Sequence, residues 1–199
     1  MVVGADSGPV YSGPVDGRGT RVLIAISSIV VVVMVAVYLS LIRAQGGTAP
    51  DWLTVPFVTA YLLTAAALLV ASLLRMGTGV RAAMRAAGAA GLLVLGYLAG
   101  FSIGVPLILA GVLAAIATLG TMSHVRGVAI AAAPAAAVIA VAVLIGGFEV
   151  SERAITCPAT GSMSGSGTGF VTGPYHWSCA GGTLHWSSGA GSTSGSASG

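Results

Sequence analysis

The chain has 199 residues, of which 56% are hydrophobic and only 7% are charged, and its formal net charge is +3. A soluble domain carries about 25% charged residues to hydrate its surface, so this composition excludes an ordinary water-soluble fold and predicts an all-α integral membrane protein. The eight basic residues are all arginines and are scattered along the chain, which excludes a basic patch for nucleic acid.

Residues 1–20 are polar and rich in glycine and proline, which predicts a flexible cytoplasmic arm. The first apolar run, about 22–42, lies too far from the N-terminus and is too long for a secretory signal, so we expect it to remain as a membrane span. A run of about 20 apolar residues matches about 30 Å of hydrocarbon. A second span is expected at about 54–74, preceded by Trp52 as an interfacial aromatic residue.

Residues 86–122 carry no charge and are too many for one span. Pro106 lacks a backbone donor and disfavours helix in the residue before it, so the chain is expected to turn at Ser102–Gly104. This gives a third span at about 83–101 and a fourth at about 105–122. A fifth follows at about 128–148, kinked at Pro134.

Arginine placement supports five spans with the N-terminus in the cytoplasm. Two arginines then lie outside, Arg43 and Arg153, and six lie inside: Arg18, Arg21, Arg75, Arg81, Arg85 and Arg126. A four-span alternative would return the cysteine-containing tail to the cytoplasm, where disulfides are rare. We therefore expect an extracytoplasmic tail at 149–187.

Cys157 and Cys179 are predicted to pair in that tail and to organise it, because it is too small to build a core. The alternatives are two free thiols or a metal pair. Tyr175–Cys179 and Thr183–Ser187 alternate in character on either side of Gly181-Gly182, which predicts a β-hairpin. Phe170–Thr172 is a candidate third strand, and residues 188–199 are expected to be disordered.

A His-Trp pair occurs twice, as His176-Trp177 and His185-Trp186. The two tryptophans, together with Tyr175, are candidate contacts for a partner protein. Two imidazoles are also a candidate metal site or pH-sensitive pair, but the tail beyond Arg153 has no carboxylate side chain or third imidazole to complete a metal site. No metal and no cofactor are predicted.

Gly96, Gly100 and Gly104 recur every four residues, so one helix face of small residues is expected. Such a face lets a second helix approach closely, either within the chain or from a partner subunit.

The expected spans contain no ionisable side chain apart from Arg85, which the arginine count assigns to the cytoplasmic loop. Proton relays and ion pathways need such groups, and an intramembrane protease needs a nucleophile with a base or paired carboxylates. His124 is expected in a loop, away from any haem in the bilayer. No catalytic residue is predicted, and the chain is not expected to be an enzyme.

The lysine-free Ala/Val/Gly/Leu spans, Thr156-Cys157-Pro158 and Trp177-Ser178-Cys179 resemble small multi-span membrane proteins of actinobacteria, of mycobacterial type. Some proteins of that kind are similar in role to accessory subunits of the cytochrome bc–cytochrome oxidase supercomplex. The resemblance implies a non-catalytic accessory or scaffold subunit, with other membrane proteins and the lipid bilayer as partners. The alternatives are a small-molecule or lipid transporter or channel, and an extracytoplasmic sensor.

Overall fold

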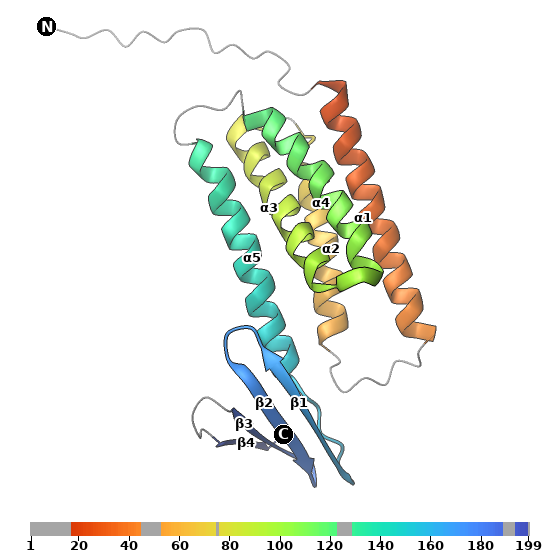
Figure 1. Ribbon diagram of the computed structural model, residues 1–199, viewed down its shortest axis with the longest axis vertical. Coiled ribbons are helices and arrows are strands. Elements are labelled where there is room, and N and C mark those ends of the chain that lie inside the picture. The colour runs from red at the N-terminus through yellow and green to blue at the C-terminus, as the bar shows by residue number, and fades with distance from the viewer. Residues whose placement is uncertain (1–16, 45–52, 75, 123–128, 189–193, 199) are drawn as a thin grey trace, which may run out of the picture.

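The computed structural model describes residues 17–44, 53–74, 76–122, 129–188 and 194–198. Five helices form a bundle: α1 (Arg18–Ala44), α2 (Thr54–Ala71), α3 (Thr78–Leu98), α4 (Gly100–Met122) and α5 (Ala129–Arg153). A small sheet follows them at one end of the bundle (Figure 1). The helical fold with a C-terminal hairpin is confirmed, although the first helix starts inside the segment expected to be a flexible arm.

Four of these helices, α1, α2, α3 and α5, are long and apolar enough to cross a membrane, and α4 contains a shorter apolar helix, Gly104–Gly120. Large apolar side chains face outward all along the bundle; Val32, Leu119 and Val138 are examples. Water would penalise such a surface, whereas lipid does not. The described part of the chain is therefore built as a multi-pass membrane protein.

Helix α3 lies at the centre of the bundle, because it contacts α2, α4 and α5, while α1 packs on α2 and α4. The buried core consists mainly of leucine and alanine side chains from these helices. Buried hydroxyl groups bond to helix carbonyls: Ser27 Oγ of α1 donates to Ala110 O of α4 at 2.8 Å, and Thr118 Oγ1 donates to Ala114 O at 2.7 Å. Polar atoms inside lipid need such partners.

The charge-free region forms two helices, but the turn between them lies at Ala99–Gly100 and not at Ser102–Gly104. Gly100 has a φ of +64°, a left-handed conformation that glycine adopts without strain, and it reverses the chain there. Pro106 lies inside α4 and does not mark the break. The position of the turn is therefore set by a glycine with a positive φ and not by the proline.

The C-terminal sheet has four antiparallel strands in sequence order: β1 (Ser162–Gly169), β2 (Gly173–Ala180), β3 (Thr183–Ser188) and β4 (Ser194–Ser198). The predicted hairpin is confirmed as β2 and β3, and Gly181 and Gly182 have φ values of +56° and +81°, as a type I′ turn requires. The prediction for Phe170–Thr172 was wrong, because these residues form the turn between β1 and β2.

Strand β4 also differs from expectation, since Ser194–Ser198 pairs with β3 where disorder was predicted. Apart from Met163, strands β1 and β4 consist of serine, glycine, threonine and alanine, and their pairing uses backbone hydrogen bonds. Such strands lack the apolar alternation by which strands are found in a sequence.

Candidate functional site at the junction of helix and sheet

The aromatic side chains of the sheet lie on one face. The register pairs Trp177 of β2 with Trp186 of β3, and Tyr175 with Ser188. Because side chains alternate across a strand, Tyr175, Trp177 and Cys179 share a face, which we call the aromatic face. The three residues predicted to contact a partner, Tyr175, Trp177 and Trp186, are half-buried.

Glycines of β1 make room for the aromatic rings. Gly165 pairs with Trp177 and Gly167 with Tyr175. A Cβ atom on Gly165 would lie 2.6 Å from Cζ2 of Trp177, and one on Gly167 would lie 2.5 Å from Cζ of Tyr175. The rings therefore cover the glycine backbone, which explains why a strand of serine and glycine suits this position.

The predicted disulfide is confirmed: Cys157 and Cys179 are joined, with their Cα atoms 5.5 Å apart. Cys157 lies in the segment that follows α5, and Cys179 lies near the end of β2 with 1% of its surface exposed. The bond ties the sheet to the segment that connects it to the bundle. In the chain-entropy model, a disulfide that closes a loop of this length stabilises the folded state by about 3 kcal/mol.

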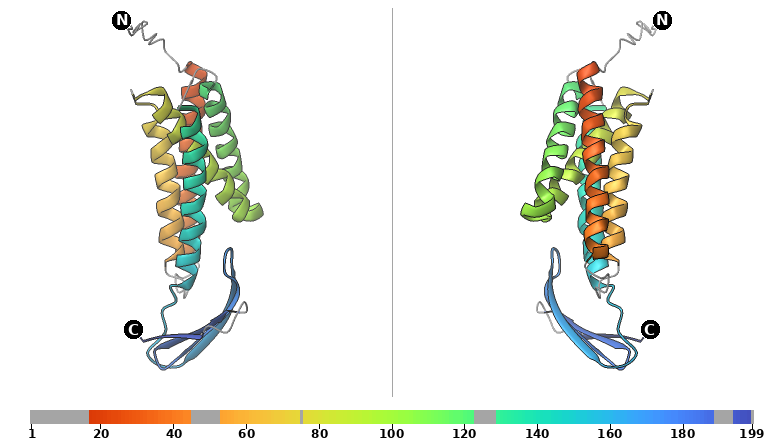
Figure 2. Two further views of the ribbon diagram at one scale, coloured as in Figure 1. Left: turned by 90° about the vertical axis from the view of Figure 1, so that its left-hand side faces the viewer. Right: turned by 90° about the vertical axis from the view of Figure 1, so that its right-hand side faces the viewer.

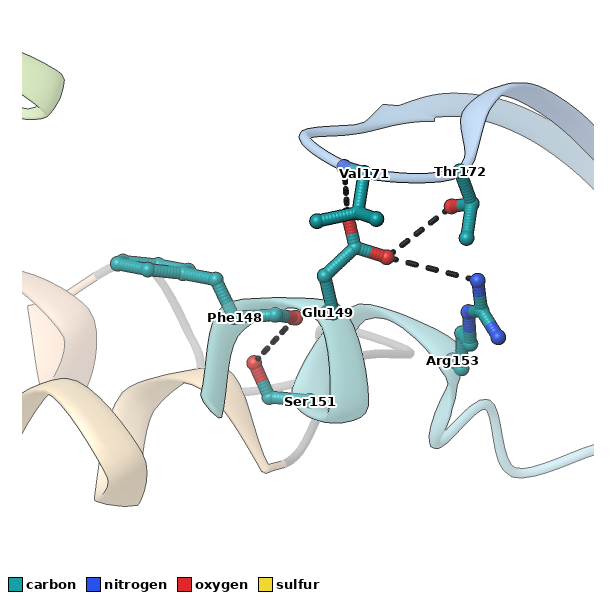
Figure 3. Close-up of polar contacts among 6 residues, drawn as sticks. All are labelled: Phe148, Glu149, Ser151, Arg153, Val171 and Thr172. Atoms are coloured by element: carbon teal, nitrogen blue, oxygen red, sulfur yellow. Dashed lines mark hydrogen bonds and ion pairs between the residues drawn. The ribbon is translucent and has the colours of Figure 1, made fainter. Parts of the chain in front are cut away.

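Glu149, near the end of α5, makes a second link to the sheet (Figure 3). Its Oε1 atom accepts a hydrogen bond from the backbone N–H of Val171 at 2.6 Å, and its Oε2 atom accepts one from Thr172 Oγ1 at 3.0 Å. Arg153 Nη2 lies 3.5 Å from the same Oε2 atom. The carboxylate therefore holds the β1–β2 turn against the helix with charge-assisted hydrogen bonds.

The turn fits closely around this carboxylate. A Cβ atom on Gly169 would lie 2.9 Å from either oxygen of Glu149. Only a residue without a side chain leaves the carboxylate room to reach Val171 and Thr172. We call this arrangement of Gly169, Val171 and Thr172 around Glu149 the carboxylate latch.

A cavity of about 220 Å³ lies between the aromatic face and the end of α5. The Arg153 guanidinium lies 5.9 Å from the ring centre of Trp186, within the range of a cation–π contact. The remaining lining is mainly apolar: Ile155, Thr172, Tyr175, Trp177, Leu184 and Ser188. The cavity joins a cation and aromatic rings in one small space.

The two histidines lie on the other face of the sheet, which we call the outer face. His176 pairs with Ser187 and Ser178 with His185, so the imidazoles are neighbours along a diagonal. Both imidazoles are exposed and line a shallow hollow of about 520 Å³ together with the two tryptophans and small residues of the three strands. Within the described ranges, no three histidine, cysteine, aspartate or glutamate residues gather in a way that could hold a metal ion. His124 lies outside those ranges.

The three glycines expected on one helix face belong to two helices. Gly96 of α3 and Gly104 of α4 meet within the chain, since a Cβ atom on Gly104 would overlap the carbonyl oxygen of Gly96. Gly100 lies in the turn with open space around its Cα atom, so the expectation of a shared face is wrong for it. Gly111, missed in the sequence, extends the contact: a Cβ atom there would lie 2.8 Å from Cγ of Leu93. Its spacing of seven from Gly104 was the available signal.

Arg85 corrects a further expectation, because it lies inside α3 with no exposed surface. Its Nε donates to Ser72 Oγ at 3.1 Å, and its Nη2 lies 3.5 Å from the Ser72 carbonyl oxygen at the end of α2. An arginine near carbonyls at a helix C-terminus is electrostatically favourable. The sequence carried a signal, since Arg85 falls in the buried row with Ala82, Ala89 and Leu92.

No known protein family, curated protein or solved structure matches the chain. By its fold, the described part of the chain is a multi-pass helical membrane protein. It carries a disulfide-closed β-sheet at the end of α5.

Proposed function

We propose that the chain is a non-catalytic integral membrane subunit that holds a partner through its sheet, as an accessory or scaffold component of a larger, respiratory membrane complex. The observation that carries the proposal is the fixed mounting of the sheet. A disulfide and the carboxylate latch both attach it to the end of α5. A surface held in place before binding loses less conformational entropy when a partner docks.

The outer face of the sheet is the surface that we assign to the partner. It presents small, uncharged side chains and two imidazoles around a shallow hollow. Such side chains need little desolvation compared with charged ones and leave room for projecting groups of another protein. Of the three aromatic candidates, Trp177 and Trp186 line this hollow and could contact the partner there, whereas Tyr175 does not line it.

The proposed orientation has the N-terminus in the cytoplasm and the sheet outside. The start of α1 and the sheet lie at opposite ends of the bundle (Figure 2). Arg18, Arg21 and Arg81 belong to the ends of α1 and α3 that lie away from the sheet. Their excess over Arg43 and Arg153 fits the positive-inside rule. An oxidising compartment also suits the disulfide.

Mild detergent extraction followed by blue-native electrophoresis tests the subunit proposal. The wild-type chain should migrate in a large complex, and Ser178→Arg, at the centre of the outer face, should release it. Ser178→Ala is the matched control and should leave the complex intact. A wild-type chain that migrates as a bare monomer would overturn the proposal.

The cavity favours a second candidate function, an extracytoplasmic sensor. Arg153 and the rings of Tyr175, Trp177 and Trp186 line a space of about 220 Å³, below the usual range of about 300–1,000 Å³ for ligand pockets. Only a small compound would fit. Tryptophan fluorescence titrations with small anionic aromatic compounds test this candidate, and Leu184→Trp, which fills the cavity, should abolish any response.

A further inference from the structure

The β1–β2 turn carries two large apolar side chains in the open. Phe170 has 55% of its surface exposed and Val171 has 77%. Strand ends in soluble proteins usually carry polar turn residues, so a paired phenylalanine and valine at a tip requires an apolar environment to cover it.

The position of this tip relative to α5 identifies that environment. The turn points back toward the helices beside the last turns of α5, away from the far end of the sheet (Figures 1 and 2). The hydrogen bond from Val171 N–H to Glu149 fixes its level along the helix. Glu149 directly follows the apolar run that ends at Phe148, and Val150 on the same turn has 68% of its surface exposed. The tip therefore lies where the apolar surface of α5 ends.

The carboxylate latch makes this position compatible with lipid. A backbone N–H at the edge of the hydrocarbon region is costly unless it has an acceptor. Glu149 accepts from Val171 N–H and from the Thr172 hydroxyl, and Arg153 lies close enough to offset its charge. These two donors of the turn are thus satisfied by α5, and the side chains of Phe170 and Val171 are exposed.

From these observations we infer that the β1–β2 tip, Phe170 and Val171, inserts into the lipid interface next to α5 and forms a membrane anchor for the sheet. The occupant of this surface is the phospholipid bilayer itself. The inference depends on α5 spanning the membrane and not on the proposed partner or on which side the sheet faces. Amphipathic anchors of this kind bury apolar side chains about 5–10 Å into the boundary between headgroups and acyl chains.

Photocrosslinking of the full-length chain in phosphatidylcholine nanodiscs tests the anchor. A p-benzoylphenylalanine replaces Phe170 in one variant and Ala180, which is exposed at the other end of β2, in the matched control. Intact-mass spectrometry should show phospholipid adducts that are several-fold more abundant at position 170 than at 180. The inference would be overturned by equal amounts of lipid adduct at the two positions, or by crosslinks at position 170 that form to protein and not to lipid. Resistance of both cysteines to alkylation verifies that each variant is folded.

A second variant tests the role of the latch. Glu149→Ala, combined with the crosslinker at position 170, should lower the lipid adduct several-fold because the turn is no longer held beside α5. Arg43→Ala, on a different helix at the same end of the bundle, should leave the adduct unchanged. An unchanged adduct in Glu149→Ala would refute the role assigned to the carboxylate.

Discussion

At the scale of single residues, two charged side chains organise regions that contain few other charges. Glu149 gathers the β1–β2 turn, and Arg85 bonds to the end of α2 from inside the bundle. Each is held by hydrogen bonds to another element of the fold, and Arg85 has no exposed surface through which water could stabilise its charge. Changes at these two positions should therefore have larger effects than changes at exposed charges.

Glu149→Ala should leave the Val171 N–H without its acceptor and weaken the attachment of the turn by roughly 1–3 kcal/mol. Hydrogen–deuterium exchange of residues 170–172 should accelerate accordingly. Glu149→Gln keeps an oxygen acceptor but loses the charge, so exchange should lie between the wild type and the alanine variant. Wild-type exchange in Glu149→Ala would show that the latch does not hold the turn.

Arg85→Lys should be more destabilising than Arg85→Met. Lysine keeps a charge in the buried position but loses the planar fork that reaches Ser72, at a cost of roughly 1–3 kcal/mol. Methionine removes the charge together with its desolvation cost, so its net effect should be smaller. Thermal unfolding in detergent measures both, with Arg21→Lys on the exposed surface of α1 as the neutral control.

At the scale of elements, helices and strands differed in how well their sequences predicted them. The helices could be located from uninterrupted apolar runs, because a helix must have an apolar stretch of a certain length to cross the bilayer. The Gly181-Gly182 turn located the β2–β3 hairpin. Strands β1 and β4 were not found, since backbone pairing leaves no apolar pattern in glycine and serine. The contact of Glu149 with a turn 22 residues further along depends on tertiary packing, which no local pattern encodes.

The α3–α4 contact should be the element interface most sensitive to added volume. In Gly104→Ala the new methyl group overlaps the Gly96 carbonyl, and overpacking of this kind costs about 1–3 kcal/mol. Gly120→Ala on the same helix places its methyl group in open space and should have little effect. The two variants are compared by thermal unfolding in detergent. Equal unfolding temperatures would contradict the close approach of the two helices.

At the scale of the whole molecule, the helical bundle is apolar and its helices pack through small residues. The sheet carries polar and aromatic side chains and lies at one end of the bundle. The odd number of helices in the described chain places the start of α1 and the sheet at opposite ends of the bundle (Figure 1). The proposed partner surface then lies at the end of the bundle opposite to the start of α1.

Reporter fusions test that arrangement. A fusion after Arg126 should be cytoplasmic and a fusion after Glu152 extracytoplasmic, because α5 crosses the membrane between them. Alkaline phosphatase and fluorescent-protein reporters give opposite signals at each site, so each measurement controls the other. Two fusions on the same side would rule out α5 as a span, and with it the lipid anchor at the β1–β2 tip.

The position of the disulfide has a consequence for biogenesis. Cys157 precedes β1 and Cys179 lies in β2, so both thiols leave the ribosome before the first residue of β3, Thr183. Once oxidation has closed the loop that contains β1 and its turn, the β1–β2 pair is covalently fixed to the segment that follows α5. Strands β3 and β4 can then add in order to that template, which lowers the loop entropy that a four-stranded sheet must otherwise overcome.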